Sequence, residues 1–363
     1  MYFGSSQMKN YGKYFLLIAA VLAIIAIIML ALQPHAGAGP VIILFFLCLA
    51  TGIRSSVLFK GFSFTIIIFA AVAAAMYYPG FFSEINGFDL KTLIVPLLIV
   101  IMFGMGTSMS LKDFAGVIKM PKGVLIGITC QFTIMPFVGF GLAYLTGLPP
   151  EIAAGIILVG SSPSGLASNV MSYISGANLA LSLTLTAIAT LLAPIITPFL
   201  MKLLADQLVP IDFWGMVWSI TKIVILPIIG GLVFNRFAHG KLPWLDKAMP
   251  VISMAGIAII ITIITAAGRD SLLTIGLTLI LAVFVHNSIG YFLGYWGSRI
   301  SGLDKKSART IAFEVGMQNA GLASGIALEM GRVATMGLAP AVFGPLMNIT
   351  GSSLATWWRG QKI

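Results

Sequence analysis

Long apolar segments alternate with short polar ones along the chain. The apolar segments run for about 20 residues without the alternation of a strand, and such segments form membrane-spanning helices. The predicted spans cover residues 14–32, 40–53, 60–79, 91–110, 121–146, 151–175, 178–203, 213–235, 249–267, 271–298, 307–330 and 336–358. The second span is short for about 30 Å of hydrocarbon, so it either extends past Arg54 or is partly re-entrant. The pattern predicts an all-α polytopic membrane protein.

The composition agrees with a chain that faces lipid. Hydrophobic residues make up 59% of the chain and charged residues only 9%, whereas a soluble domain carries about 25% charged residues. The net charge of +10 builds no nucleic-acid-binding face, because the basic residues are distributed among separate loops. The expected partner is therefore the lipid bilayer, and no nucleic acid is expected.

Clusters of basic residues alternate with loops that hold few of them, namely Lys91, Lys202, Arg269 and Arg332. The basic clusters are Lys9 and Lys13, Arg54 and Lys60, Lys112 to Lys122, Arg236 to Lys247, Arg299 to Arg309, and Arg359 with Lys362. The intervening loops carry several acids, among them Glu84, Asp206 and Asp270. Because cytoplasmic loops are enriched in Lys and Arg, both termini are predicted to be cytoplasmic. A multi-pass protein of the cell inner membrane or plasma membrane is expected.

The first span shares a basic start and an apolar run with signal peptides. The apolar part of a signal peptide is only about 7–15 residues long, so the longer run at residues 14–32 favours a retained transmembrane helix. Cys48 and Cys130 lie within apolar runs, and they predict buried thiols rather than a disulfide.

The chain repeats a pattern of features at a spacing near 155 residues. Gln131–Pro136 precedes His286–Tyr291 by this distance, and Pro163, in one Gly-rich break, precedes Gln318, in another, by the same distance. Each repeat then spans five helices, and the odd number inverts the second copy; inverted repeats with matching interrupted helices are typical of transporters. The predicted organisation is a ten-helix core at 55–363, with repeat one at about 55–205 and repeat two at about 211–360, and about two additional transmembrane helices at 1–54.

The first break, Gly160–Asn169, interrupts a predicted span. Pro163 lacks a backbone donor and the neighbouring glycines relax φ. Carbonyl groups are thereby freed at membrane depth, where only protein or a watery cavity can receive them. Ser168 and Asn169 add side-chain oxygens to the same segment.

The second break, Glu314–Gly321, contains a carboxylate deep in a span. A charge at this depth costs several kcal/mol and is by default a functional-site hypothesis. Ser182 and Thr186 of another span share one helix face as an i, i+4 pair, and Thr190 continues it. Hard oxygen ligands suit small hard cations, and unwound carbonyls coordinate Na⁺ in transporters with broken helices. The two breaks therefore predict a sodium site.

Each feature has an ordinary structural explanation when it is taken alone. Ser and Thr in membrane helices often bond to their own backbone, Gly and Pro are common there, and a glutamine such as Gln131 can hold two helices together. Glu314 alone is also compatible with a protonated structural acid. Their joint occurrence at matching positions of two halves favours an ion site.

Several short motifs follow one another between residue 55 and the C-terminus. They are Phe103–Gly106 with Asp113-Phe114, Gln131-Phe132 with Met135-Pro136, the Ser162–Asn169 break, Ala180–Ser182 with Thr186, Glu314–Asn319, and Asn348–Gly351. In these motifs the chain resembles the bile acid:sodium symporter family, in the form of a bacterial sodium-dependent organic anion transporter. The resemblance implies a core domain and a panel domain that move against each other, with crossed discontinuous helices at the centre.

The same resemblance implies two sodium sites that share Glu314. Sodium site one would consist of Ser168, Asn169, Ser182, Thr186 and Glu314. Sodium site two would consist of the side chains of Gln131, Glu314 and Gln318 with the backbone carbonyls of Val315 and Met317. Two Na⁺ ions beside one carboxylate leave a positive centre, which favours an anionic substrate nearby.

The substrate cavity implied by the resemblance differs in this chain. Related proteins commonly have Gly-Gly-Thr where this chain has Ser164-Gly165-Leu166, and many have Trp-His where it has Leu346-Met347. The residues expected at the cavity are Leu166, Asn319, Met347 and Asn348. A bile acid-like anion, a steroid conjugate and a small carboxylate all remain open as the substrate.

The sequence thus predicts a secondary active symporter, not an enzyme, that uses a sodium gradient to import an organic anion. The alternative is a cation/proton antiporter of related inverted-repeat fold, which would need a pair of deep carboxylates or a carboxylate with a lysine; Lys222 is the only basic residue well inside a span. An intramembrane enzyme built on His286, Ser182 and Glu314 would lack a nucleophile motif.

Overall fold

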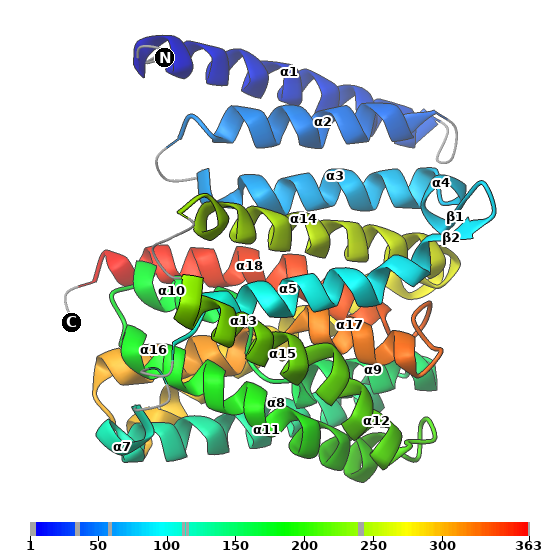
Figure 1. The fold of residues 1–363 in the computed structure, drawn as a ribbon. Helices are drawn as coiled ribbons and strands as arrows, with labels where there is room; N and C mark the ends of the chain where they lie inside the picture. The colour runs from blue at the N-terminus through cyan, green and yellow to red at the C-terminus, as the bar shows by residue number, and fades with distance from the viewer. Residues whose placement is uncertain are drawn as a thin grey trace. The chain divides into compact units, whose positions relative to one another are not determined.

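A computed structural model of the chain describes residues 5–32, 37–56, 60–110, 113, 116–238 and 243–361. Phe114, which belongs to one of the motifs above, and the basic residues Lys112, Lys241 and Lys362 lie outside these ranges. The described residues are mostly helical, with one small hairpin (Figure 1).

The helices and strands follow the predicted spans closely. In chain order they are α1 (Ser5–Leu32), α2 (Ala38–Ile53), η1 (Lys60–Phe62), α3 (Ser63–Tyr77), α4 (Gly80–Ser83), β1 (Glu84–Ile85), β2 (Phe88–Asp89), η2 (Leu90–Leu93), α5 (Ile94–Ser108), α7 (Gly116–Lys119), α8 (Pro121–Leu145), α9 (Pro150–Ser161), α10 (Leu166–Ile174), α11 (Leu179–Ala205), α12 (Phe213–Ile220), η3 (Thr221–Ile225), α13 (Leu226–Ala238), α14 (Pro243–Ala267), α15 (Arg269–Ile300), α16 (Lys305–Gly316), α17 (Ala320–Glu329) and α18 (Leu338–Arg359). Each predicted span coincides with one helix or with consecutive helical segments.

Seven helices among the described residues are long and apolar enough to cross a membrane. They cover Tyr11–Leu32, Leu90–Ser108, Pro121–Leu145, Leu179–Ala205, Phe213–Phe237, Ala248–Ala267 and Arg269–Ile300. Shorter apolar helices include α9 and α17, which are halves of the two interrupted spans. The prediction of an all-α polytopic membrane protein is confirmed. One detail differs from it, because the span 213–235 is not a uniform α-helix but contains the π-helical turn η3.

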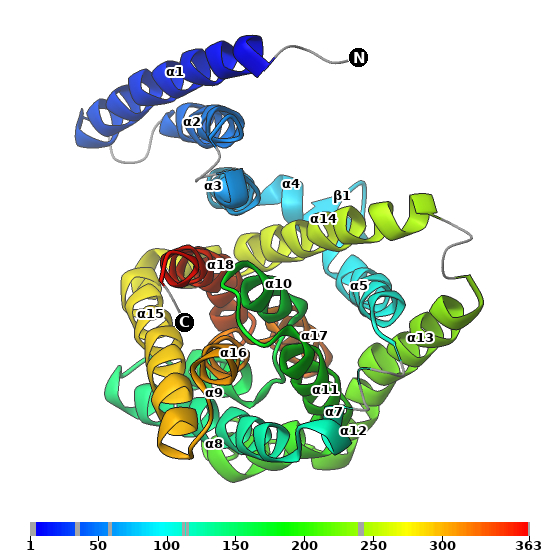
Figure 2. The same cartoon turned by 90° about the vertical axis from the view of Figure 1, so that its left-hand side faces the viewer.

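The chain divides into two compact units, Met1–Leu90 with Ile261–Arg269, and Lys91–Ile260 with Asp270–Ile363. In the first unit, α1 packs against α2 and α2 against α3, as both ribbon views show (Figures 1 and 2). Its hairpin β1–β2 turns at Asn86 and Gly87, both with positive φ; Asn and Gly are the residues that tolerate this turn geometry.

In the second unit, the two interrupted spans lie among intact helices. The first interrupted span, α9 and α10, packs against α8, α11 and α18, and the second, α16 and α17, contacts α8, α11 and α18 as well (Figure 2). Asn178 and Asn319 cap α11 and α17, because their side chains accept hydrogen bonds from Leu181 and Leu322 N–H; such caps define where a helix begins.

Glycines let the neighbouring helices approach the two breaks closely. A Cβ at Gly160, just before the end of α9, would overlap the Met135 carbonyl of α8. A Cβ at Gly316, the last residue of α16, would overlap the Tyr291 ring of α15. Because only glycine leaves this space free, α8 and α15 hold the ends of the interrupted helices firmly in place.

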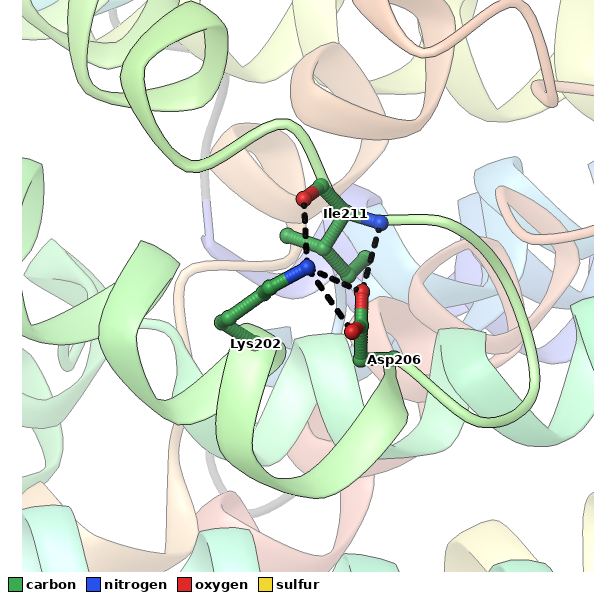
Figure 3. Close-up of polar contacts among 3 residues, drawn as sticks. All are labelled: Lys202, Asp206 and Ile211. Atoms are coloured by element: carbon green, nitrogen blue, oxygen red, sulfur yellow. Dashed lines mark hydrogen bonds and ion pairs between the residues drawn. The ribbon is translucent and has the colours of Figure 1, made fainter.

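The connection between α11 and α12 is held by a small polar cluster (Figure 3). The Lys202 Nζ donates to Asp206 at 2.8 Å and to the Ile211 carbonyl at 3.3 Å, and the Ile211 N–H donates to Asp206 at 3.0 Å. This cluster fixes the turn that links the two predicted repeats.

Replacing Asp206 with asparagine is expected to lower the melting temperature slightly near neutral pH. The hydrogen bond from Lys202 lowers the pKa of the Asp206 carboxyl, and the Ile211 N–H adds to the shift. A carboxyl with a lowered pKa stabilises the fold above its unfolded pKa of about 3.9, and this contribution is lost as the pH falls through the lowered value. Thermal unfolding measured from neutral pH down to about pH 2 should show the deficit of Asp206→Asn disappearing at the acid end. A deficit that persists there would contradict this origin.

Candidate functional site

The two breaks lie side by side and are joined through their backbones. The Gly165 N–H donates to the Met317 carbonyl at 3.2 Å, and the Asn319 N–H donates to the Pro163 carbonyl at 2.8 Å. Ser164 and Gln318 form an isolated antiparallel bridge between these bonds. Each break thus supplies partners for backbone groups that the other break has freed, which membrane depth requires.

The carboxylate of Glu314 lies beside this junction, in a cluster of hydroxyl groups. Glu314 is 1% exposed. Its Oε1 accepts hydrogen bonds from Ser168 at 2.7 Å and Ser182 at 2.6 Å. Its Oε2 accepts from Ser164 at 2.5 Å and Thr186 at 2.9 Å. The structure therefore brings together the residues predicted for sodium site one, and adds Ser164, which the sequence-based prediction assigned to no site.

Three of these hydroxyls have more acceptors within reach than hydrogens to donate. Ser182 also lies 2.8 Å from Asn169 Oδ1, Thr186 lies 3.1 Å from the same oxygen, and Ser168 lies 2.8 Å from the Gly165 carbonyl. A hydroxyl has one hydrogen and two lone pairs, so each of the three can satisfy only one of its two acceptors. The remaining oxygens keep lone pairs that a bound cation could use.

The charge of the cluster also favours a bound cation. Among the described residues, no Lys, Arg or His side chain is paired with Glu314; Lys202 pairs with Asp206, and Arg332 pairs with Glu151. A buried carboxylate without a counter-charge is costly even when it is hydrogen-bonded. Oxygen ligands around an unpaired negative charge can hold a small hard cation.

Apart from Glu314, the residues predicted for sodium site two form a second hydrogen-bonded group at the junction. Gln131 Nε2 donates to Gln318 Oε1 at 2.8 Å and to the Ser162 carbonyl at 3.0 Å, while Gln318 donates to the Val315 carbonyl. The Met317 carbonyl accepts the bond from Gly165 described above. Gln131 Oε1 is fully buried without a hydrogen-bond partner, which leaves a free acceptor on this side chain. The hydrogen bonds described for the Glu314 carboxylate all come from the hydroxyl cluster.

Polar residues of α15 and α18 brace the second break. Asn287 Nδ2 donates to the Gly316 carbonyl at 2.7 Å, and Thr350 Oγ1 donates to Asn287 Oδ1 at 2.6 Å. The sequence-based prediction did not assign Asn287 or Thr350 to the site. The sequence did contain a signal for Asn287, because a polar side chain within an apolar span usually bonds to a neighbouring helix.

The four residues expected at a substrate cavity lie on three elements. Leu166 begins α10 and is partly exposed, and Asn319 caps α17 with its side chain. Met347 and Asn348 lie in α18, with Met347 buried and Asn348 partly exposed. The Met347 carbonyl accepts a hydrogen bond from the Tyr291 hydroxyl at 3.2 Å.

Of the residues on which the alternative functions depend, all of them within the described ranges, Lys222 and His286 have no hydrogen bond or ion pair with Glu314, whereas Ser182 does. Lys222 is exposed in η3, with its Nζ 5.9 Å from the centre of the Trp218 ring. His286 contacts the Met135 carbonyl of α8 at 2.9 Å, whereas Ser182 donates to Glu314. Thr190 donates to the Thr186 carbonyl of its own helix at 2.7 Å and takes no part in the cluster.

Interrupted helices that meet around a buried carboxylate in a polytopic helical protein are typical of membrane transporters. The chain belongs to the sodium bile acid symporter family. The model of the Sodium Bile acid symporter family matches residues 95–275. The family assignment made from the sequence motifs is thereby confirmed.

Curated relatives from bacteria and plants support this membership. The uncharacterized sodium-dependent transporter YocS of Bacillus subtilis (strain 168) is 39% identical over 301 residues, which make up 83% of this chain and 92% of that protein. The probable sodium/metabolite cotransporter BASS1, chloroplastic, of Arabidopsis thaliana is 36% identical over 262 residues, or 72% of this chain and 65% of that protein. BASS2, chloroplastic, of Oryza sativa subsp. japonica, which bears the same description, is 35% identical over 72% of this chain and 63% of its own length. The chain thus spans slightly less than two thirds of these two plant relatives.

Proposed function

We propose that this protein is a secondary active symporter that uses a sodium gradient to import a small organic anion. The observation that carries the proposal is the oxygen cluster around Glu314, which has an unpaired negative charge and fewer hydrogens than acceptors. The names of its relatives, a sodium-dependent transporter and sodium/metabolite cotransporters, support sodium as the coupling ion.

Two sodium ions are proposed, with Glu314 shared between them. One ion takes the hydroxyl cluster with Asn169, and the other takes the group around Gln131 and Gln318 with the carbonyls of Val315 and Met317. The unpartnered Gln131 Oε1 supports the second position. Two Na⁺ charges against one carboxylate leave a net positive charge, so an anion binds more tightly when both ions are present. By linkage, the anion raises the affinity for sodium by the same factor.

The proposed architecture follows the resemblance described above. Residues 55–363 would form two inverted five-helix repeats, about 55–205 and 211–360, arranged as a core and a panel domain, with 1–54 as additional helices. Both termini would be cytoplasmic, in a cell inner membrane or plasma membrane. The backbone bonds between the breaks support the crossing of discontinuous helices that this arrangement requires.

The substrate is proposed to bind beside the junction, near Leu166, Asn319, Met347 and Asn348. These side chains are neutral. Charge recognition is therefore assigned to the two sodium ions, and shape recognition to the apolar side chains. Bile acid-like anions, steroid conjugates and small carboxylates are the classes to screen.

A thermal-shift screen of organic anions, run in sodium and in potassium buffers, tests the proposal. The expected result is a stabilisation by one class of anion that requires sodium, followed by sodium-dependent uptake of that anion into proteoliposomes. Equal responses in both salts would contradict sodium coupling. Sodium flux driven by a pH gradient without any organic anion would instead establish the cation/proton antiporter.

A further inference from the structure

Ser164 is placed by the junction of the two breaks rather than by a helix. It is 1% exposed and lies between the end of α9 and the start of α10. Its backbone pairs with Gln318 as the antiparallel bridge, between the bonds of Pro163 with Asn319 and of Gly165 with Met317. The backbone bridge with Gln318 thus sets the direction of the Ser164 side chain, and Gln318 is itself one of the residues predicted for sodium site two.

The Ser164 hydroxyl completes the hydrogen bonding of the Glu314 carboxylate. A carboxylate accepts about four hydrogen bonds. Ser168 and Ser182 donate to Oε1, Thr186 donates to Oε2, and Ser164 supplies the other donor to Oε2 at 2.5 Å. Ser164 is the donor that comes from the junction itself, so it connects the carboxylate to the bridge with Gln318.

The bond between the junction and the Glu314 carboxylate depends on the hydroxyl group of Ser164. In the family pattern described above, glycine commonly stands here, and glycine cannot donate a hydroxyl. Because the Ser164 hydrogen is used by Glu314, both lone pairs of its oxygen remain available to a cation. A hydroxyl oxygen is the kind of ligand that a small hard cation prefers.

We propose that Ser164 is an additional sodium ligand of this chain, which joins the two sodium sites and raises the affinity for sodium. The inference rests on the proposed function and extends it to a residue outside the two predicted ligand sets. A sodium ligand and a purely structural hydroxyl at position 164 predict different measurements. A ligand changes the sodium concentration at half-saturation, whereas a structural hydroxyl changes the stability of the protein without sodium.

The test compares Ser164→Ala and Ser164→Gly with the natural protein in sodium titrations. Sodium-dependent thermal stabilisation and sodium-dependent uptake are both followed. The half-saturating sodium concentration is expected to rise about tenfold in both variants, which corresponds to about 1.4 kcal/mol, close to the lower end of the range for a hydrogen bond to a charged group. The melting temperature in potassium should fall only modestly in both variants, since the Glu314 carboxylate loses one of its four hydrogen bonds, and the sodium titration therefore carries the test.

Ser324→Ala is the matched control. Ser324 is equally buried, lies in the other interrupted span, and donates to the Ala320 carbonyl of its own helix at 2.9 Å. It should leave the sodium titration unchanged.

The outcomes separate this inference from the proposed function. If the natural protein responds to sodium and both Ser164 variants titrate as it does, the inference is overturned and the symporter proposal stands. A lower melting temperature in potassium for Ser164→Gly, with unchanged half-saturation or with loss of the fold, also overturns it. If the natural protein itself shows no sodium response, it is the proposed function that fails.

Discussion

Replacing Glu314 with glutamine is expected to abolish sodium-dependent uptake while leaving the fold intact. Glutamine keeps the size of the side chain but removes the negative charge that the hydroxyl cluster surrounds. A cation placed there would be buried without a counter-charge, at a cost of about 3–5 kcal/mol, so the half-saturating sodium concentration should rise by at least about 100-fold. Uptake into proteoliposomes at graded sodium concentrations measures this effect.

Glu329→Gln is the matched control for this variant. Glu329 is the other acid of the same interrupted span, and it is exposed at the end of α17. Its substitution should leave sodium-dependent uptake unchanged. Thermal unfolding in potassium should show that Glu314→Gln is folded, because a neutral amide is less costly to bury than a carboxylate. Normal sodium-dependent uptake by Glu314→Gln would falsify the proposed ion site.

Removing the two hydroxyls of α11 that contact Glu314, with Ser182→Ala and Thr186→Val together, is expected to weaken sodium binding by about 100-fold. Each hydroxyl contacts Glu314 and also Asn169 Oδ1, so the double variant strips one face of the cluster. Because the two residues share both partners, their effects should not be additive. Sodium titrations of the single variants and the double variant form a double-mutant cycle that measures the coupling.

Thr190→Val provides the control on the same helix. Thr190 is buried one turn further along α11, and its hydroxyl bonds to the Thr186 carbonyl. Its loss should change the half-saturating sodium concentration by less than about twofold, since the hydroxyl merely supplements the helix backbone. An equal loss of affinity in Thr190→Val and in the double variant would assign the effect to helix packing and contradict a ligand role.

The membrane spans and the two breaks could be predicted from the sequence because each has a local cause. Continuous apolar runs fix the spans by length, and Pro163 interrupts one of them by removing a backbone donor. Glu314 was recognised because a carboxylate within an apolar span is rare and costly. The pairing of Ser182 with Thr186 followed from the period of the α-helix.

Ser164 and Asn287 could not be assigned to the site in this way. A residue in a break has no helical phase, so the direction of the Ser164 side chain depends on its bridge with Gln318, which is remote in the sequence. Asn287 lies on a helix whose polar face is set by contact with Gly316 of another helix. The π-helical turn η3 was missed for a related reason, since one extra residue in a turn scarcely changes an apolar pattern.

The backbone bonds between the breaks also determine when the site can exist during synthesis. The Pro163 carbonyl finds its partner in Asn319, near the end of a chain of 363 residues. While the first half is being inserted into the membrane, its unwound segment must therefore wait with unsatisfied polar groups until α16 and α17 arrive. A chain truncated between the two breaks would leave the Pro163 carbonyl without this partner in the bilayer.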